Sequence, residues 1–406
     1  MGPPSLRGDR GADAVPLPLS ARSRADEAAA AQIFAASWVD RDRVVAGTKC
    51  GTLLEIDTAR RAWKRIERPA VEPPQEVAEA LPTRATVDDC GIHAVRTNPG
   101  ASLLAAGGRN PCDFAVLELP TYRHLQELVG HSDWVFACDW LTDTQLLTAS
   151  RDKTVKVWDL AKRVATPNAG EECVATMAAH TAKVRDAKYS PQTGKVASLG
   201  TDGKLLLWDP HGACRVEHEV PLQHTTELIC LCMDAHLVCA GSLSHLSLLD
   251  YRTRRQILHV TSMNPGLGIR SLSLRDGVMT VGGGAGTISF FDLRQQRFIN
   301  VAPPGDQDPS RNRGLAADVD RCPRPAGACN LKLGKGRVHG GRLPGMGGPT
   351  PWAAQYFAVP PVLPAGQDAK HACYTHSWAP CNTKMFVAGG PLQFLLSGTY
   401  ASLWTA

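Results

Sequence analysis

The chain has 406 residues, and its 44 basic and 39 acidic side chains give a formal net charge of +5, too mild by itself to indicate a nucleic-acid partner. Aromatic residues make up 6% and charged residues 20%, as in an ordinary globular protein. No apolar run reaches about eighteen residues and the N-terminal stretch has no apolar signal core, so we expect neither a membrane span nor secretion. The thirteen cysteines are scattered singly through predicted strands, which favours a reduced intracellular compartment.

Seven repeat-like units follow one another along the chain, and each consists of short apolar strands separated by polar turns. Residues 1–30 precede them, are rich in Pro, Ala and Arg, and are predicted to be disordered. Residues 303–368 are rich in Gly and Pro and predict a disordered insertion before the last unit. The units span residues 32–57, 90–119, 131–160, 180–209, 224–252, 267–294 and 372–406.

The third unit carries the most specific pattern, with a strand LLTAS, a turn Arg151-Asp152-Lys153 and a strand that closes on Trp-Asp. This order is that of a WD repeat, in which a His, a Ser or Thr, an Asp and a Trp form a buried chain of hydrogen bonds. The residues that fill these places are His131, Thr148 or Ser150, Asp152 and Trp158. The fourth unit repeats the set about 50 residues later, with His180, Ser198, Asp202 and Trp208. His131 and Asp152 are therefore expected to be scaffold rather than a catalytic acid–base pair.

The repeats predict an all-β fold, a seven-bladed WD40 β-propeller made of residues 31–302 and 369–406. The last unit stops at its third strand. A propeller closes when the missing outer strand comes from the other terminus, and an open edge promotes aggregation, so we expect a segment before Gln32, such as Val15–Ser20, to supply that strand.

Five cationic side chains occupy equivalent places in different repeats. The turn between the second and third strands and the start of the first strand lie on one face of a propeller, around the mouth of its central channel. These positions hold Lys49 and Arg151 in turns, and Lys183, Arg185 and Arg270, with His93, at first-strand starts. Like charges repel by about 1 kcal/mol per pair at a few ångströms in water, so the cluster favours an anionic ligand over a merely solvated surface. Arginine in particular grips carboxylate or phosphate with two parallel hydrogen bonds.

Catalytic and metal motifs are lacking. The sequence has no nucleophile with a base, no paired carboxylates at the mouth, no Walker loop and no zinc motif, so we predict no enzyme activity, no catalytic residue, no metal and no cofactor. Cys230-Leu-Cys232 places two thiols on one face of a strand, but without a partner at zinc spacing, core packing is favoured. The glycines between Gly282 and Gly286 are not followed by a helix pattern and predict a turn.

In its repeat units the sequence resembles the WD40 substrate receptors of the cullin-4 RING ubiquitin ligase, and within them the associated factors of type 12. The similar stretches cover nearly the whole chain from Phe34 to Trp404 and include VVAGTKCGTL, CGIHAV, GHSDWVF, LLTASRD, KVRDA, GIRSLS, ISFFDLRQQRF, NLKLGKG, CYTHSW, TKMFVAGGPL and GTYASLW. The resemblance implies a non-catalytic receptor that docks on the triple-propeller adaptor of the ligase, assembles with cullin-4, and presents proteins ending in Glu-Glu for ubiquitination. It also implies an acid-binding pocket made of Lys49, Arg151, Lys183, Arg185 and Arg270, with Gln32 where relatives have a lysine.

On the adaptor side, Asp292 and Arg294 resemble the Asp-x-Arg signature of these receptors, and Asp250 with Arg252 is a second copy. The alternative is the ordinary strand-end Asp of a WD blade. The resemblance further implies a cytoplasmic and nuclear protein that is also centrosomal, without a membrane or nucleic-acid partner. A reading from a different class also stays open: a propeller scaffold that binds another anionic partner, a phosphopeptide or nucleic acid, outside any ligase.

Overall fold

The structure is a computed structural model that describes residues 32–60, 62–67, 91–108, 110, 112–164, 173–211, 214–299, 331–332, 353–359, 371–391 and 399–405. Strands dominate these ranges, and one short 3-10 helix, η2 (Leu160–Val164), follows the third repeat unit. Within the same ranges, no helix is long and apolar enough to cross a membrane.

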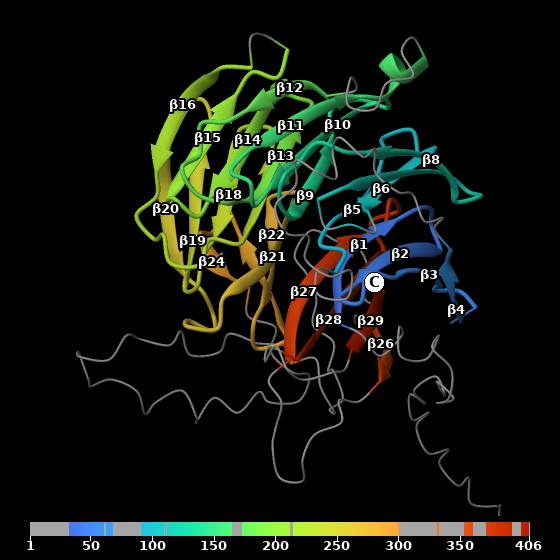
Figure 1. The fold of residues 1–406 in the computed structure, drawn as a ribbon. Coiled ribbons are helices and arrows are strands. Elements are labelled where there is room, and N and C mark those ends of the chain that lie inside the picture. The colour runs from blue at the N-terminus through green and yellow to red at the C-terminus, as the bar shows by residue number, and fades with distance from the viewer. Residues whose placement is uncertain are drawn as a thin grey trace, which may run out of the picture.

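The described strands form seven antiparallel sheets arranged around a common centre (Figure 1). The innermost strands are β1 (Ile33–Trp38), β5 (Val95–Thr97), β9 (Val135–Trp140), β13 (Val184–Ser190), β17 (Cys230–Asp234), β21 (Ile269–Arg275) and β27 (His371–Trp378). The second strands are β2 (Arg43–Thr48), β6 (Leu103–Gly107), β10 (Gln145–Ser150), β14 (Lys195–Gly200), β18 (Leu237–Gly241), β22 (Val278–Gly283) and β28 (Lys384–Pro391).

Two more strands complete each sheet toward the outside. The third strands are β3 (Leu53–Asp57), β7 (Phe114–Glu118), β11 (Val155–Asp159), β15 (Lys204–Trp208), β19 (His245–Asp250), β23 (Thr287–Asp292) and β29 (Thr399–Thr405). The outer strands are β4 (Ala62–Ile66), β8 (Arg123–Leu128), β12 (Cys173–Met177), β16 (Val216–Pro221), β20 (Arg255–Thr261), β24 (Arg297–Phe298) and β26 (Ala353–Val359).

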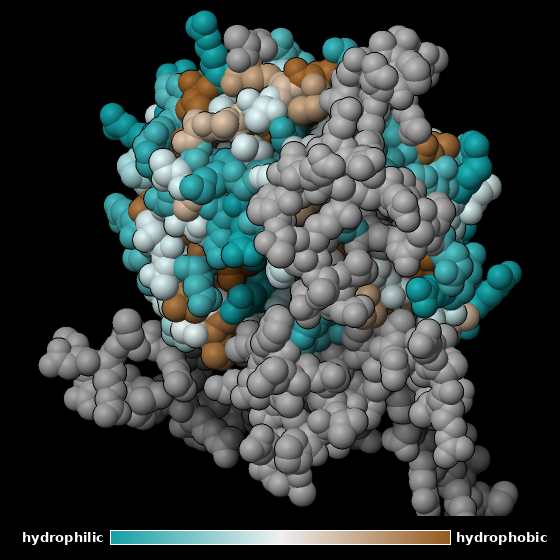
Figure 2. Space-filling model, viewed as in Figure 1, coloured by the Kyte–Doolittle hydropathy of each residue, from teal (hydrophilic) through white to brown (hydrophobic). Residues whose placement is uncertain are grey.

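The inner strands contact one another in a closed circle, in the order β1, β5, β9, β13, β17, β21, β27 and back to β1. Because each sheet lies radially with its first strand at the centre, the predicted all-β propeller is confirmed. Apolar side chains fill the spaces between neighbouring sheets. Leu147 and Leu206 pack between the third and fourth sheets, and Val44 and Phe386 join the first sheet to the last. Figure 2 shows hydrophilic side chains prevailing on the visible surface of the sheets, with apolar ones scattered among them.

The last sheet receives its outer strand from a different segment than predicted. Six sheets are built from four consecutive strands, whereas the seventh has the order β26-β29-β28-β27. Its outer strand β26 pairs with β29 from Ala353↔Thr405 to Val359↔Thr399, so the missing outer strand comes from residues 353–359. The prediction that Val15–Ser20 supplies this strand is therefore wrong, and Val15–Ser20 itself lies outside the described residues, as do the other residues of 1–30.

The predicted disorder of residues 303–368 is also wrong for two short strands within it. Besides β26, β25 (Leu331–Lys332) pairs with β23 through Ile288↔Leu331 and Thr287↔Lys332. The segment AAQYFAV has aromatic and β-branched residues that suit a strand, but the Gly- and Pro-rich sequence around it dominates a composition average. The rest of 303–368 lies outside the described residues.

Candidate functional site

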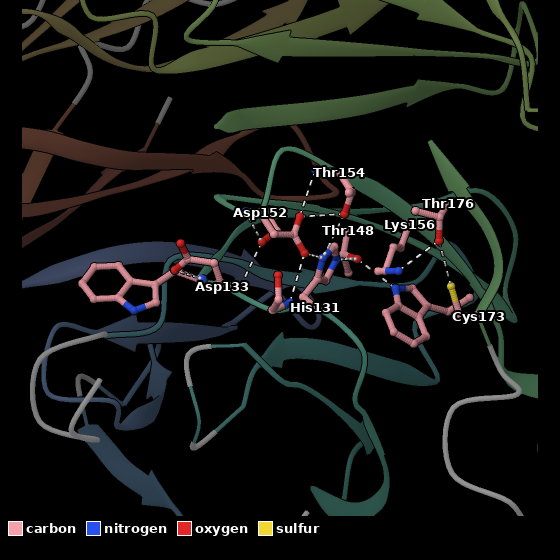
Figure 3. A network of polar contacts seen from close by, with 12 residues as sticks. His131, Asp133, Thr148, Asp152, Thr154, Lys156, Cys173 and Thr176 are labelled. Carbon is pink, nitrogen blue, oxygen red and sulfur yellow. Dashed lines mark hydrogen bonds and ion pairs between the residues drawn. The ribbon is translucent and has the colours of Figure 1, made fainter. Parts of the chain in front are cut away.

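The third sheet contains the predicted buried chain of hydrogen bonds (Figure 3). The Nδ1 of His131 lies 2.7 Å from an Asp152 carboxylate oxygen, and its Nε2 lies 2.8 Å from the Thr148 hydroxyl. That hydroxyl also accepts a hydrogen bond of 2.8 Å from Nε1 of Trp158. Thr148 therefore fills the place for which Ser150 was the alternative, because the Ser150 hydroxyl donates to the carbonyl of Asp133 instead.

The fourth sheet repeats this chain. His180 lies 3.0 Å from Asp202 and 2.8 Å from the Ser198 hydroxyl, which accepts a hydrogen bond from Trp208. Burial lowers the pKa of both His131 and His180. Both rings are enclosed and use both nitrogens, so their predicted role as scaffold is confirmed.

One backbone device shapes the mouth of the central channel. On five inner strands the register with the second strand skips one residue, and this β-bulge residue is Phe34, Phe136, Arg185, Arg270 or Tyr374. A bulge redirects the side chain of the extra residue. All five residues line one cavity of about 340 Å³, together with His93 at the start of the second unit.

The cationic side of this cavity contains two of the five predicted pocket residues. Burial first, and then the nearby Arg270 guanidinium, lower the pKa of Arg185. Arg185 also lies 4.2 Å from the ring centre of Phe136, in a cation–π contact. Two arginines that repel one another at a partly enclosed mouth are arranged to receive a negative charge.

The aromatic side was not predicted from the sequence. Phe34 stacks on His93 with ring centres 4.9 Å apart, and the edge of Tyr374 approaches Phe34 at 5.3 Å. His93 in turn approaches Phe136 at 5.5 Å. The signal that could have found these rings is positional, because Phe34, Phe136 and Tyr374 occupy the place in their repeats that Arg185 and Arg270 occupy in theirs.

The other three predicted pocket residues lie at the same end of their sheets but are not among the residues that line the cavity. Lys49, in the turn after β2, donates its backbone N–H to the carbonyl of Gln32, and Arg151 does the same to Trp134. The Arg151 side chain lies 3.5 Å from Asp133 and 5.7 Å from the centre of the Trp134 ring. Lys183 is exposed directly before β13. The structure therefore brings Arg185 and Arg270 together, and leaves the other three at the rim.

Deeper in the channel, further charges join neighbouring sheets. Arg96 lies 3.2 Å from Asp139, whose other oxygen accepts the backbone N–H of Tyr189 on the next sheet. Lys188 donates to Asp186 at 2.7 Å, and Asp186 also accepts the N–H of Leu231 on the sheet after that. The Asp139 carboxylate is the main reason that the pKa of Arg96 is raised. These pairs fix one sheet against the next.

The predicted adaptor residues lie at the opposite end of the propeller, because they follow third strands rather than precede first ones. Asp250 and Asp292 each accept the backbone N–H of the arginine two residues later at 2.8 Å. Asp57, Asp159 and Asp209 make the same turn at the ends of β3, β11 and β15. The structural role of the two aspartates is thus shared by several sheets. The arginines are exposed, and Arg252 lies 3.1 Å from Asp250.

The predicted core role of two cysteines is confirmed, since Cys230 and Cys232 are buried in the apolar cluster between the fifth and sixth sheets. Burial raises the pKa of Cys230. In the described ranges, no group of three or more His, Cys, Asp or Glu side chains could hold a metal ion.

The radial four-stranded sheets, the two buried His–Asp–Ser/Thr–Trp chains and the lined central channel define a WD-repeat β-propeller. The family model described as the DDB1- and CUL4-associated factor 12 beta propeller matches residues 21–172 and 165–314. The chain belongs to this family.

Two curated relatives match shorter parts of the chain. The DENN domain and WD repeat-containing protein SCD1 of Arabidopsis thaliana is 28% identical over 127 residues, which are 31% of this chain and 10% of the relative. The nuclear distribution protein PAC1 of Arthroderma otae is 35% identical over 97 residues, 22% of this chain and 19% of the relative. The chain thus spans at most 19% of the length of these two relatives, and the likeness is one of WD repeats.

Proposed function

We propose that this protein is a non-catalytic substrate receptor of a cullin-4 RING ubiquitin ligase that binds proteins ending in Glu-Glu. The family supports association with the adaptor and the cullin named in its description. In this proposal the seventh sheet completes a seven-bladed propeller, and the receptor works in the cytoplasm and nucleus, and also at the centrosome.

The observation that carries the proposal is the pair of arginines at equivalent β-bulges, Arg185 and Arg270, which face one cavity. A Glu-Glu terminus has three carboxylates within a few ångströms, and each charge-assisted hydrogen bond to one contributes about 1.5–3 kcal/mol. In the proposal, Arg185 and Arg270 bind the deepest carboxylates, while Lys49, Arg151 and Lys183 at the rim interact with the outer ones.

The adaptor docks at the other end of the propeller in this proposal, through Arg252 and Arg294. Antiparallel sheets place the turn after a third strand at the end opposite the turn after a second strand. A substrate in the channel mouth and an adaptor at the other end would then not compete for space.

The test uses three versions of one peptide: a free Glu-Glu end, the same end amidated, and the end extended by one Gly. We expect the free end to bind, and amidation to weaken binding because one of three charges is lost. Higher salt should weaken it as well, since the Debye length is about 8 Å at physiological ionic strength. Arg185→Glu or Arg270→Glu should abolish binding. Equal affinity for all three peptides would contradict the proposal and favour a reader of internal acidic or phosphorylated segments.

A further inference from the structure

The guanidinium of Arg270 has N–H donors that the described residues satisfy only in part. A guanidinium has five N–H donors. The Nη2 of Arg270 makes a long hydrogen bond of 3.4 Å to the carbonyl of Leu267, and its buried Nε has no hydrogen-bond partner in the described part of the chain. Its side chain is only 20% exposed, so water satisfies these donors poorly.

Among the described residues, the carboxylate of Glu227 faces this arginine. A Glu227 oxygen lies 3.6 Å from Nη2 of Arg270, within ion-pair range but longer than a good hydrogen bond. Glu227 also acts on the neighbouring arginine, because its charge opposes the lowering of the Arg185 pKa by burial and by Arg270. Glu227 therefore influences both arginines of the mouth, whereas Asp186, a carboxylate that lines the same cavity, is paired with Lys188.

The backbone holds Glu227 at this place while its side chain stays free to move. Before it, the carbonyl of Thr226 accepts the N–H of Leu243, and after it Leu228 is buried between the fourth and fifth sheets. Glu227 has a φ of 49°, in the left-handed region that residues other than glycine seldom adopt. Its side chain is 54% exposed, so it can turn into solvent without disturbing the core.

We infer that Glu227 is an internal competitor that covers Arg270 when the mouth is empty and is displaced by an incoming acidic chain end. This inference rests on the proposed function and names a residue that sets its selectivity. A ligand with a single carboxylate would gain little on displacing Glu227, because one ion pair replaces another. A ligand with several carboxylates would gain binding free energy on displacing Glu227, because its remaining carboxylates reach Arg185 and the cations at the rim.

The test compares Glu227→Gln with the wild type in titrations of a Glu-Glu peptide. Glutamine keeps the shape and removes the charge, so we expect binding to tighten roughly two- to fivefold, the range for an exposed ion pair. The matched control is Glu219→Gln, on the outer strand β16 of the fourth sheet. It removes the same charge from an ion pair with Lys204 of β15 and should leave the affinity for the peptide unchanged. In an Arg270→Gln background, the gain from Glu227→Gln should shrink, because only the effect of Glu227 on Arg185 remains. Unchanged or weaker binding of Glu227→Gln, or a gain of the same size without Arg270, would overturn the inference.

A second measurement does not depend on the peptide. Phenylglyoxal modifies free guanidinium groups, and the rate at Arg270 can be followed by peptide mapping. We expect Arg270 to react roughly two- to fivefold faster in Glu227→Gln than in the wild type. If the wild type does not bind the Glu-Glu peptide, the proposed function fails, and the labelling rate alone decides whether Glu227 covers Arg270. Equal labelling rates in the two proteins would show that Glu227 does not shield Arg270.

Discussion

The indole Nε1 of Trp38 donates a hydrogen bond of 2.8 Å to the backbone carbonyl of Ser377, which lies 339 residues later in the chain. This contact joins the first sheet to the last. Other sheet boundaries use the same device, since Trp140 donates to the carbonyl of Arg96 and Trp378 to the hydroxyl of Thr280. The circle of sheets is thus closed by the same kind of tryptophan hydrogen bond that joins other neighbouring sheets.

The first prediction concerns this closure. Trp38→Phe removes the donor from a side chain that is 5% exposed and leaves a gap beside Ser377. We expect the free energy of unfolding to fall by about 1–3 kcal/mol. Trp63→Phe, on the outer strand of the same sheet and only partly buried, should cost less. Chemical denaturation measures both, and equal losses would mean that the Trp38 hydrogen bond does not contribute to closure.

The second prediction concerns the buried chain of the third sheet. Thr148→Val keeps the shape of the side chain but leaves His131 and the indole N–H of Trp158 without their shared partner. We expect a loss of about 2–4 kcal/mol in unfolding free energy, because two buried polar groups become unsatisfied. Thr176→Val removes an exposed hydroxyl that bonds Lys156 and should change stability by about 0.5 kcal/mol or less. A neutral Thr148→Val would show that the chain does not stabilise the sheet.

The third prediction concerns acid. His376 lies between the hydroxyls of Ser271 and Ser273, at 2.8 and 2.7 Å, and burial lowers its pKa to about 4. The unfolded chain takes up this proton near pH 6.5, well before the folded protein does. Unfolding therefore becomes easier as pH falls from about 6.5 to about 4, by up to about 3 kcal/mol from this group. Denaturation curves across this range should show a shallower pH dependence for His376→Gln, and an unchanged slope would contradict the assignment.

The fourth prediction concerns docking. Arg252→Ala combined with Arg294→Ala should reduce recovery of the adaptor in a pull-down. Stability should change by about 0.5 kcal/mol or less, because both side chains are exposed. Arg123→Ala is the matched control, since Arg123 and Arg252 are each 66% exposed and each pair with a carboxylate on their own sheet. Full adaptor recovery by the double variant would remove these arginines from the interface.

The fifth prediction concerns the ring beneath Arg185. Phe136→Leu removes a cation–π contact of 4.2 Å and lets the guanidinium move. We expect the affinity for a Glu-Glu peptide to fall by roughly three- to thirtyfold, as for a partly desolvated pair. Phe34→Leu tests whether any aromatic ring that lines the cavity would have the same effect, because Phe34 stacks on His93 rather than on an arginine. Equal effects of the two variants would point to general packing.

Local patterns determined most of the architecture. The four residues of each buried hydrogen-bond chain come from one repeat of about 30 residues. The spacing from His131 to Trp158 was therefore enough to predict the hydrogen bonds that the structure contains. Positional equivalence between repeats likewise identified Arg185 and Arg270, because a circular fold brings equivalent positions to one mouth.

Only the tertiary structure decided three further points. Which side chains enter the cavity depends on the β-bulges, and a bulge is a register between two strands that composition does not encode. The strand that completes the last sheet is defined by its pairing with β29, from Ala353↔Thr405 to Val359↔Thr399, and the Gly- and Pro-rich sequence around residues 353–359 does not indicate that pairing. The contact of Glu227 with Arg270 joins neighbouring sheets 43 residues apart in the chain, and such a distance is fixed by packing alone.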